Sequence, residues 1–553
     1  MKLNGAQIVL EALKEQGVDT IFGYPGGTIL NIFDELYKYG DTFKHILTSH
    51  EQGASHAADG YSRATGKVGV CFATSGPGST NLVTGIATAY MDSVPVVAIT
   101  CNYATSGLGR DSFQEVDICG ITMPITKHNF QVKTVEELAP TIRRAFKIAM
   151  SGRKGPVLVD IPKDITAAEC EYTPEPAQMP EEPVHPKNNC FDRAVELLSN
   201  AKRPLIYVGG GAVSSDVGEK LITFAEKLDA PVVSSLMGLG AFPNGHPLHV
   251  GFIGMHGRFE ANKAAHDCDV LIAAGARFSD RVAGNRKKFA PNAEILHIDI
   301  DAAEMDKNIV SNYHLRADLN QIIPQLTQAI EQCDHSKWKA EISSWKKPFV
   351  QTQIGDFVNP QKVIEAVDKY TPDDTVVVTD VGQHQMWVAQ YYKYVQPRTQ
   401  LTSGGLGTMG YSMGAAIGAA IGCPDKKVVM FVGDGGFHMN LSELATVASY
   451  NVPVVMIIMN NKVLGMVRQW QKIFYGNRFS DTDPHRVTDF VKVAESFGIK
   501  GVRIENNSQV DDVIKNAFEG NEPILIDCRI SPDSNVLPMI PPGGAAADII
   551  EEM

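Results

Sequence analysis

The chain has 553 residues, of which 44% are hydrophobic and 20% charged, a composition typical of a globular protein with about three domains. Its formal net charge is −13 and no basic run stands out, which argues against nucleic acid or an anionic membrane as the main partner. The nine cysteines form no CxxC pair, so we expect reduced thiols and a cytoplasmic location.

Residues 1–168 alternate helix and strand signals. Glu11 and Glu15 interrupt the apolar pattern at the N-terminus, so this stretch is predicted to be an amphipathic helix and not a signal peptide. Polar or glycine-rich loops follow several of the strands, as in a doubly wound parallel sheet with its ligand-binding edge at the strand C-termini. The strands are predicted at residues 19–23, 43–48, 68–73, 96–100 and 157–161.

Residues 169–186 are rich in proline and glutamate and are predicted to be a linker. A second α/β domain is expected over residues 187–335. Its last strand has an acidic end suited to ribose hydroxyl groups, although no GxGxxG motif supports a simple NAD site. The strands are predicted at residues 205–208, 231–235, 270–274 and 295–301.

Residues 336–358 are polar and predict a helical linker, and a third α/β domain is expected over residues 359–553. In this domain a buried strand, residues 428–432, runs into Gly433-Asp434-Gly435-Gly436, and the next predicted strand, residues 454–459, ends on Asn460-Asn461. A right-handed crossover places both strand ends at one edge of the sheet. Asp and Asn oxygens suit Mg²⁺, and the glycines allow a diphosphate to approach, whereas Asp-Gly alone is a common turn.

Glu51 follows a predicted strand in the loop His-Glu-Gln-Gly-Ala, and by itself it would be interpreted as a solvated surface residue. The spacing from GDG to the Asn pair resembles the fingerprint of the thiamine diphosphate enzyme superfamily, which also requires a glutamate near the N-terminus. That glutamate faces N1′ of the cofactor and sets its tautomer. The resemblance implies that the first domain binds the pyrimidine and the third the diphosphate, between two subunits of at least a homodimer.

Further motifs narrow this resemblance and cover nearly the whole chain. They are YPGG, HEQGA, TSGPG, DSFQE, ITKHN, GPVLVDIPKDI, GMHG, GARFSDR, HIDID, QHQMW, TSGGLGTMG, GDGGF, NN, LGMVRQWQ and LPMIPPGG. Together they resemble the catalytic large subunits of the acetohydroxyacid synthase family, the biosynthetic acetolactate synthases. This family uses thiamine diphosphate, Mg²⁺ and FAD.

The resemblance implies roles for individual residues. The groups at the reacting centre would be Glu51, Gly27, Phe113, Gln114, Lys163, Arg281, Met466 and Trp470. Thiamine diphosphate would be held by Gln383, His384, Gly407, Met409, Gly433, Asp434, Gly435, Gly436 and Asn461, and Mg²⁺ by Asp434, Asn461 and the carbonyl of Val463.

The central domain resembles the FAD-bearing domain of the biosynthetic branch. The expected contacts are Arg153, Gly209, Gly210, Gly211, Leu236, Met237, Met255, His256, Gly257, Gly275, Arg277, Asp280, Asp299 and Ile300. The carboligation needs no net redox step, so the FAD would have a structural role.

The implied reaction condenses pyruvate with a second 2-oxo acid, pyruvate or 2-oxobutyrate, and releases CO₂. Arg281 would bind the carboxylate of the second acid, and Trp470 would contact its alkyl group. The implied partners are these small molecules, a second or further copies of the chain in a homodimer or homotetramer, and a regulatory small subunit. The alternatives are another FAD-retaining enzyme of the superfamily, such as a 2-oxo-acid oxidase or glyoxylate carboligase, and a non-catalytic homologue. The intact Glu51, Asp434 and Asn461 argue against the non-catalytic homologue.

This chain departs from the usual family pattern at four places. Cys101-Asn102-Tyr103-Ala104 stands where GQVP is usual, Ser279 replaces Asp, Gly414 stands where Pro is common, and Gly436 replaces Ser. The first change affects the expected substrate channel, the second the FAD site, and the last removes a hydroxyl donor near the diphosphate.

Overall fold

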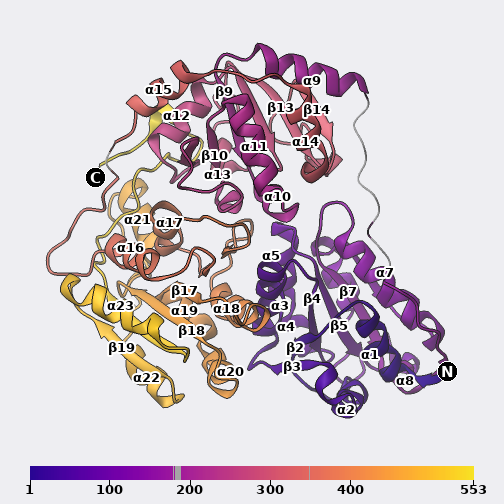
Figure 1. The fold of residues 1–553 in the computed structure, drawn as a ribbon. Coiled ribbons are helices and arrows are strands. Elements are labelled where there is room, and N and C mark those ends of the chain that lie inside the picture. Colours follow the sequence, from indigo (N-terminus) through magenta and orange to yellow (C-terminus); the bar gives the residue numbers. More distant parts are fainter. Residues whose placement is uncertain (178–179, 181–187, 348, 553) are drawn as a thin grey trace.

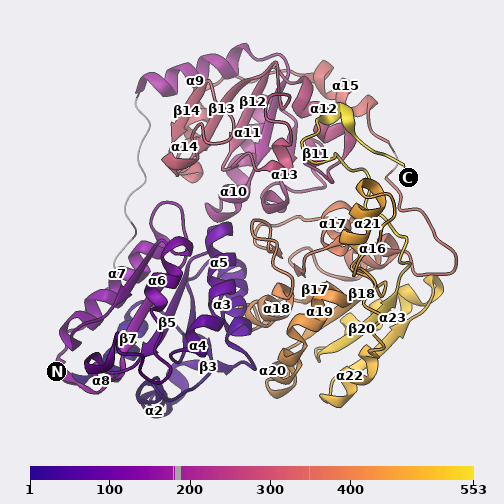
Figure 2. The ribbon, with the colours of Figure 1, turned by 180° about the vertical axis from the view of Figure 1, so that it is seen from behind.

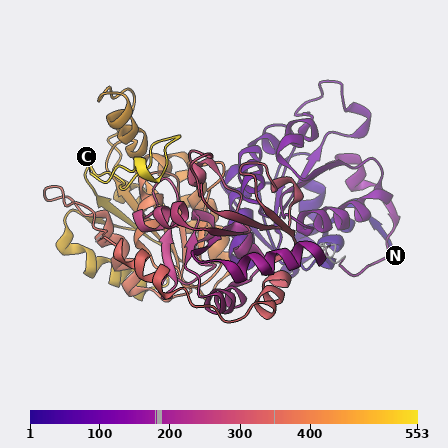
Figure 3. The same cartoon turned by 90° about the horizontal axis from the view of Figure 1, so that it is seen from above.

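The computed structural model describes residues 1–177, 180, 188–347 and 349–552, and it contains three α/β domains, each built on a six-stranded parallel sheet. The central domain lies above the other two in Figure 1, and the first and third domains lie on opposite sides when seen from above (Figure 3). The predicted fold class is confirmed. Residues 178–179 and 181–187, which include part of the predicted linker and the predicted start of the second domain, lie outside the described residues.

The first and third sheets share one strand order. Numbered within each domain, it is 2-1-3-4-6-5, so the likeness between these two parts of the sequence is a likeness of topology. The first sheet is β3 (Lys44–Leu47), β2 (Thr20–Gly23), β4 (Gly69–Ala73), β5 (Val96–Asn102), β7 (Val157–Pro162) and β6 (His128–Gln131). The third is β16 (Gln400–Thr402), β15 (Val376–Thr379), β17 (Val428–Gly433), β18 (Val454–Asn460), β20 (Ile524–Arg529) and β19 (Lys500–Ile504).

The central sheet has a different order, 3-2-1-4-5-6, which is the order of dinucleotide-binding folds. Its strands are β11 (His249–Phe252), β10 (Val232–Ser234), β9 (Pro204–Val208), β12 (Val270–Ala274), β13 (Glu294–Asp299) and β14 (Tyr313–Arg316). The order reverses between β9 and β12, and ligands of such sheets bind in the crevice at that point.

Two helices join the first and third domains, and they lie side by side in Figures 1 and 2. They are α3 (Glu51–Thr65) and α18 (Tyr411–Gly422), and small residues bring their backbones close. A Cβ added to Gly418 would overlap the carbonyl oxygen of Ala57, and one added to Gly60 would overlap that of Ala415. Helix α18 is apolar on all sides because it is buried on all sides.

Both predicted linkers begin too early. Strand β8 (Glu169–Glu171) pairs antiparallel with β1 (Lys2–Asn4), so the first residues of the 169–186 linker belong to the first domain. Helix α15 (Ser336–Ser344) buries Trp338 in the central core, and the indole N–H donates to the carbonyl of Pro204 at 3.1 Å. The 336–358 segment is therefore helical at its start, as predicted, but this helix packs as part of the central domain.

The chain end returns from the third domain to the central one, where the yellow segment crosses near α12 (Phe259–Asp267) in Figure 2. The N–H of Ile540 donates to the carbonyl of Met255 at 2.8 Å, and that of Asn285 donates to the carbonyl of Gly544 at 2.9 Å. The predicted N-terminal amphipathic helix is α1 (Gly5–Glu15), capped by Asn4. Among the described residues, no helix combines the length and apolar character needed to cross a membrane.

Candidate active site

The carboxyl ends of β17 and β18 bring the predicted metal ligands together. Asp434 is the first residue of α19 (Asp434–Asn440) and is buried. Burial raises the pKa of its carboxyl to about 6, and the backbone N–H of Asn461 is among the groups that oppose the rise. The side-chain oxygen of Asn461 accepts from the N–H of Val463 at 3.2 Å, which orders the turn after β18. The group has the hard oxygen donors that suit Mg²⁺.

Two side chains after β15 complete this edge. Gln383 donates to the side chain of Gln469 at 2.9 Å, and its own oxygen accepts from Asn461 at 3.3 Å. His384 is buried against Gly433, and burial lowers the pKa of its imidazole to about 3, so the ring is neutral. Within the described part of the chain, Nε2 of His384 has no hydrogen-bond partner. A buried nitrogen without a partner beside a glycine-rich turn fits a bound diphosphate.

The segment from residue 403 to residue 410 lies over the same edge. Gly407 has φ +72°, which favours glycine, and Met409 approaches Gly435. A Cβ added to Gly435 would lie 3.6 Å from the methyl carbon of Met409 and 2.7 Å from a methyl carbon of Leu464. The absence of a side chain at Gly435 therefore allows Met409 to reach the turn that carries Asp434.

In the first domain, Glu51 begins α3 at the end of the loop after β3. Its side chain is buried, and Oε2 accepts from Nδ2 of Asn81 at 2.9 Å. Gly78, in the short helix α4 (Pro77–Asn81) that follows β4, also lies against this carboxyl group. The carbonyl of Gly27, in the loop after β2, accepts from Nζ of Lys163 at 2.9 Å. The structure thus brings the predicted residues to the switch point of the first sheet.

Phe113 and Gln114 occupy an exposed loop in front of that edge. The side chain of Phe113 is 82% exposed, and Gln114 has φ +59°. Gly76 lies against the backbone of Gln114, which fixes the base of this loop. Glu51 follows a strand of the first sheet, whereas Asp434 and Asn461 follow strands of the third, so the two halves of the predicted site belong to edges of different sheets in this chain.

Arg281 and Trp470 meet although they come from different domains. The guanidinium of Arg281 lies 5.9 Å from the centre of the Trp470 ring, and its Nη1 lies 3.7 Å from the sulfur of Met255. Trp470 lies on α21 (Gly465–Phe474), whose first residue packs against Gln383 and Asn461. Met466, on the same helix, packs on the core of the third domain. The Arg281 side chain is 60% exposed and thus accessible to an anion.

The switch point of the central sheet has the close backbone approach that a dinucleotide needs. The N–H of Gly211 donates to the carbonyl of Gly275 at 3.0 Å, and a Cβ added to Gly209 would overlap the same carbonyl. Met237 packs over Gly210 at 3.2 Å from an added Cβ. These residues fit the FAD that the sequence implies, because the glycines allow the loops after β9 and β12 to pack closely together at the switch point.

The other residues expected at the FAD surround this point. Burial raises the pKa of Asp299, at the end of β13, to about 6. Burial also lowers the pKa of His256 to about 4. Arg277 donates to the carbonyl of Met91 at 2.6 Å. The remaining expected contacts are Leu236, Gly257, Asp280, Ile300 and Arg153. Arg153 pairs with Glu304, Leu236 packs on the core of the third domain, and Asp280 begins α13 (Asp280–Ala283).

Sequence reasoning missed three residues that hold this site in place. Asn81 orients Glu51, Gln469 holds Gln383, and Asp380 accepts from the backbone N–H of Gly410 at 3.0 Å. Asp380 carries the same signal as Asp434, an acid directly after an apolar strand, and could have been found. Gln469 lies within the motif LGMVRQWQ, but neither it nor Asn81 carries a local signal for its role, because both roles depend on tertiary contacts.

Family models match most of the chain. The model of the N-terminal thiamine pyrophosphate binding domain matches residues 3–121, that of the central domain residues 191–326, and that of the C-terminal binding domain residues 380–528. Together they describe a thiamine pyrophosphate enzyme in which the first and third domains bind the cofactor.

Named relatives match over nearly the full length. A probable acetolactate synthase large subunit of Methanocaldococcus jannaschii is 45% identical over 99% of this chain and 95% of its own length. The acetolactate synthase isozyme 2 large subunit of Escherichia coli is 43% identical over all of both chains. The acetolactate synthase large subunit of Corynebacterium glutamicum is 44% identical over 99% of this chain and 90% of its own. The chain therefore belongs to the acetolactate synthase large subunits, the catalytic subunits of a family of thiamine pyrophosphate enzymes.

Proposed function

We propose that this chain condenses pyruvate with a second 2-oxo acid, pyruvate or 2-oxobutyrate, to 2-acetolactate or 2-aceto-2-hydroxybutyrate. CO₂ is released, and the reaction is the first common step of the biosynthesis of valine, leucine and isoleucine. The observation that carries this proposal is the contact between Arg281 and Trp470, whose guanidinium and ring centre lie 5.9 Å apart; Trp470 lies on α21, the helix that begins beside Gln383 and Asn461. The three relatives are all named for acetolactate synthesis, which favours this reaction over the FAD-retaining alternatives.

The proposed roles follow from the chemistry of each group. Thiamine diphosphate, when bound, supplies the electron sink that decarboxylation requires. Glu51 holds and returns a proton at the pyrimidine ring, and Asn81 keeps its carboxyl group oriented. Asp434, Asn461 and the carbonyl of Val463 hold Mg²⁺, while His384 and Gln383 bind the diphosphate.

Arg281 binds the carboxylate of the second acid with two parallel hydrogen bonds, and Trp470 provides a flat apolar wall for its alkyl group. Gly27, Phe113 and Gln114 line the reacting centre from the first domain, and Lys163 lies near the substrate entrance. FAD has a structural role in the central domain, held by the glycines that follow β9 and β12. The catalytic unit is a dimer or tetramer, and a regulatory small subunit is a further partner, as the name "large subunit" of the relatives implies.

Trp470→Leu tests the choice of second substrate. Pyruvate and 2-oxobutyrate differ by one methylene, which is worth about 1–3 kcal/mol in an apolar pocket, or roughly 10–200-fold in specificity. A leucine would pack that methylene less well, so the preference for 2-oxobutyrate should fall toward unity while decarboxylation of pyruvate persists. The measurement is the ratio of the two products when both acids compete.

Arg281→Lys is the control, because both acceptors carry the carboxylate, and it should weaken both together. A product ratio that Trp470→Leu leaves unchanged would make this tryptophan a packing residue only.

The proposal that the protein binds FAD has its own test. Purified protein should release FAD on denaturation, and anaerobic pyruvate should not leave the flavin stoichiometrically reduced.

A further inference from the structure

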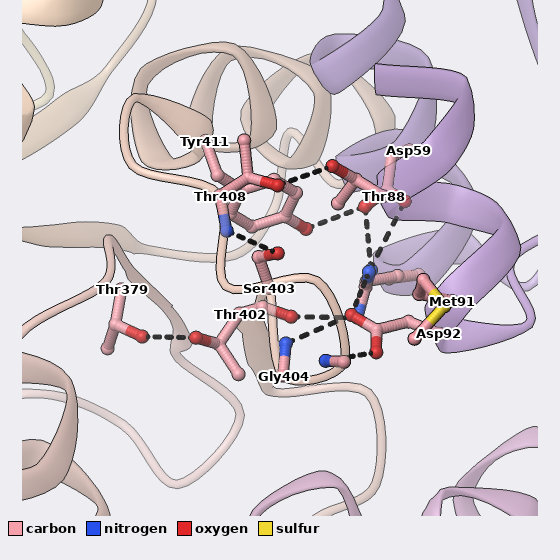
Figure 4. A network of polar contacts seen from close by, with 12 residues as sticks. Asp59, Thr88, Met91, Asp92, Thr379, Thr402, Ser403, Gly404, Thr408 and Tyr411 are labelled. Carbon is pink, nitrogen blue, oxygen red and sulfur yellow. Dashed lines mark hydrogen bonds and ion pairs between the residues drawn. The ribbon is translucent and has the colours of Figure 1, made fainter. Parts of the chain in front are cut away.

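A buried ionic cluster lies between the first and third domains. Arg63, on α3, donates from Nε to Asp59 at 2.6 Å and from Nη2 to Asp92 at 3.0 Å. Asp92 is the last residue of α5 (Val83–Asp92). The side chains of both acids are 0% exposed and that of Arg63 is 9% exposed. The hydroxyl of Tyr411 also donates to Asp59, at 2.6 Å (Figure 4).

The remaining contacts of the cluster go to the backbone at the start of the 403–410 segment. Both carboxylate oxygens of Asp92 accept from this backbone, at 3.0 Å from the N–H of Gly404 and 2.7 Å from that of Gly405. Nη1 of Arg63 donates to the carbonyl of Thr402 at 3.0 Å. The cluster has one positive charge, on Arg63, and two negative charges, on Asp59 and Asp92. The backbone N–H groups of Gly404 and Gly405 therefore supply part of the stabilisation that the second buried carboxylate needs.

Two hydroxyl contacts hold the other end of the segment. The hydroxyls of Thr88, on α5, and Thr408 lie 2.7 Å apart, and the N–H of Thr408 donates to the side chain of Ser403 at 3.0 Å. Figure 4 shows these residues facing α5 across the domain boundary. Gly407 and Met409 lie within the segment that is held in this way.

The end of α5 is itself anchored from the opposite side. Arg277 of the central domain donates to the carbonyl of Met91 at 2.6 Å, and Nε of Arg153 donates to the hydroxyl of Ser93 at 2.8 Å. Asp92 therefore lies between two residues that are held by other parts of the molecule. A buried ion pair contributes little net stability by itself, so this arrangement is better explained by the geometry that it imposes.

We propose that Asp92, supported by Arg63, is a positioning residue of the thiamine diphosphate site. It fixes the backbone of residues 403–410, so that the carbonyl of Gly407 and the side chain of Met409 are in place before the cofactor binds. This proposal rests on the proposed function and on the contacts with the cofactor that the family resemblance implies for Gly407 and Met409. Asp92 acts through the segment and does not touch the cofactor.

Asp92→Asn in the full-length protein tests this role. The amide keeps the shape but loses the charge, and it places an NH₂ group among backbone donors. Hydrogen bonds to a charged group are worth roughly 10–100-fold in an equilibrium, so backbone amide exchange within residues 403–410 should speed up by about that factor in the cofactor-free protein. The dissociation constant of thiamine diphosphate with Mg²⁺ should rise, and exchange of the C2 proton in the bound cofactor should slow.

Asp216→Asn is the matched control. Asp216 also joins two domains, through an ion pair with Arg398 at 2.9 Å, but it makes no hydrogen bond to residues 403–410 within the described chain. It should leave all three readouts unchanged. If Asp92→Asn does not fold, Thr88→Val should change the same readouts in the same direction. This variant keeps the side-chain shape and removes the contact with Thr408, together with a hydrogen bond to the carbonyl of Thr84 within α5.

The proposal would be overturned if Asp92→Asn kept wild-type amide exchange in residues 403–410 and wild-type affinity for thiamine diphosphate. If Asp92→Asn cannot be made, wild-type values of both quantities in Thr88→Val would overturn it. A failure of the proposed function would look different. In that case the wild-type protein itself would not bind thiamine diphosphate with Mg²⁺.

Discussion

Gly436 stands where the family usually has a serine, so this chain lacks a hydroxyl at that position. The structure shows why a serine would not fit here without strain. A Cβ at this position would overlap a carboxylate oxygen of Asp380. That carboxylate cannot swing away at low cost, because it accepts from the N–H groups of Gly410 and Ser412.

We therefore expect Gly436→Ser to weaken thiamine diphosphate binding and to destabilise the protein by about 1–3 kcal/mol, the usual effect of overpacking. Calorimetric titration and thermal unfolding would check this. Gly436→Ala separates the two effects, since it introduces the Cβ without the hydroxyl. A gain in cofactor affinity in Gly436→Ser alone would show that the donor matters more than the crowding.

The buried side chain of His56 should make the free energy of unfolding depend on pH. It is fully buried on α3 at the contact with Tyr411, and burial lowers the pKa of its imidazole to about 3. Because the folded pKa is below the unfolded value, the neutral ring stabilises the fold above about pH 6.5, and this contribution is lost as the pH falls. Between about pH 6.5 and pH 5 the loss is about 2 kcal/mol.

The destabilisation caused by His56→Gln should consequently shrink by that amount when it is measured at about pH 5 instead of about pH 8. Chemical denaturation of both proteins at the two pH values gives the comparison. The difference isolates His56 from the other titrating groups, because they are present in both proteins. An equal destabilisation at both pH values would mean that the imidazole of His56 has the same pKa in the folded and the unfolded chain.

At the scale of elements, the contact between α3 and α18 depends on glycines. A Cβ at Gly418 would overlap the carbonyl oxygen of Ala57, which is helix backbone and cannot move alone. Gly418→Ala should therefore push the first and third domains apart and cost about 1–3 kcal/mol or more in stability. Its control is Gly520→Ala at the end of α23 (Val510–Glu519), where an added Cβ meets nothing within 4 Å. Equal melting temperatures for the two variants would contradict this view of the interface.

The same scale shows what the sequence could and could not predict. The buried strands that face helices on both sides are continuous apolar runs, and β4, β5, β17 and β18 were located to within one or two residues. The edge strands β6, β11, β14, β16 and β19 were not identified, because a short strand with one neighbour keeps polar residues and lacks the apolar run. Strands β15 and β20 are apolar and follow the rule that located β17, so applying it there would have found them.

At the scale of the whole molecule, the sequence identified the residues of the candidate site but not how they are held. Glu51, Asp434 and Asn461 lie at strand ends, which a chain-order analysis can find. The supporting contacts of Asn81, Asp92 and Gln469 join segments far apart in the sequence, so they required the structure. The departure at Asn102 has a structural meaning only in the fold, where its amide donates to buried Asp160 at 2.9 Å.

The separation of Glu51 from Asp434 within one chain leads to a prediction about assembly. If each site combines the first domain of one subunit with the third domain of another, two inactive variants should complement each other. Glu51→Gln lowers turnover by about 10²–10⁴-fold through lost acid–base chemistry, and Asp434→Ala removes a metal ligand. In a twofold-symmetric dimer, a mixed pair contains one site with both defects and one site with neither.

Random exchange of subunits gives half mixed dimers, so refolding an equal mixture of Glu51→Gln and Asp434→Ala should restore about a quarter of wild-type activity. Each variant refolded alone is the control and should stay inactive. A double variant carrying both changes, mixed in equal amount with wild type, provides the converse test. If the halves of each site come from different chains, a mixed dimer has two sites with one defect each and no intact site, so about a quarter of wild-type activity should remain, from the wild-type dimers alone. An inactive mixture of the two single variants, together with half activity in the mixture with the double variant, would place each complete site within a single chain.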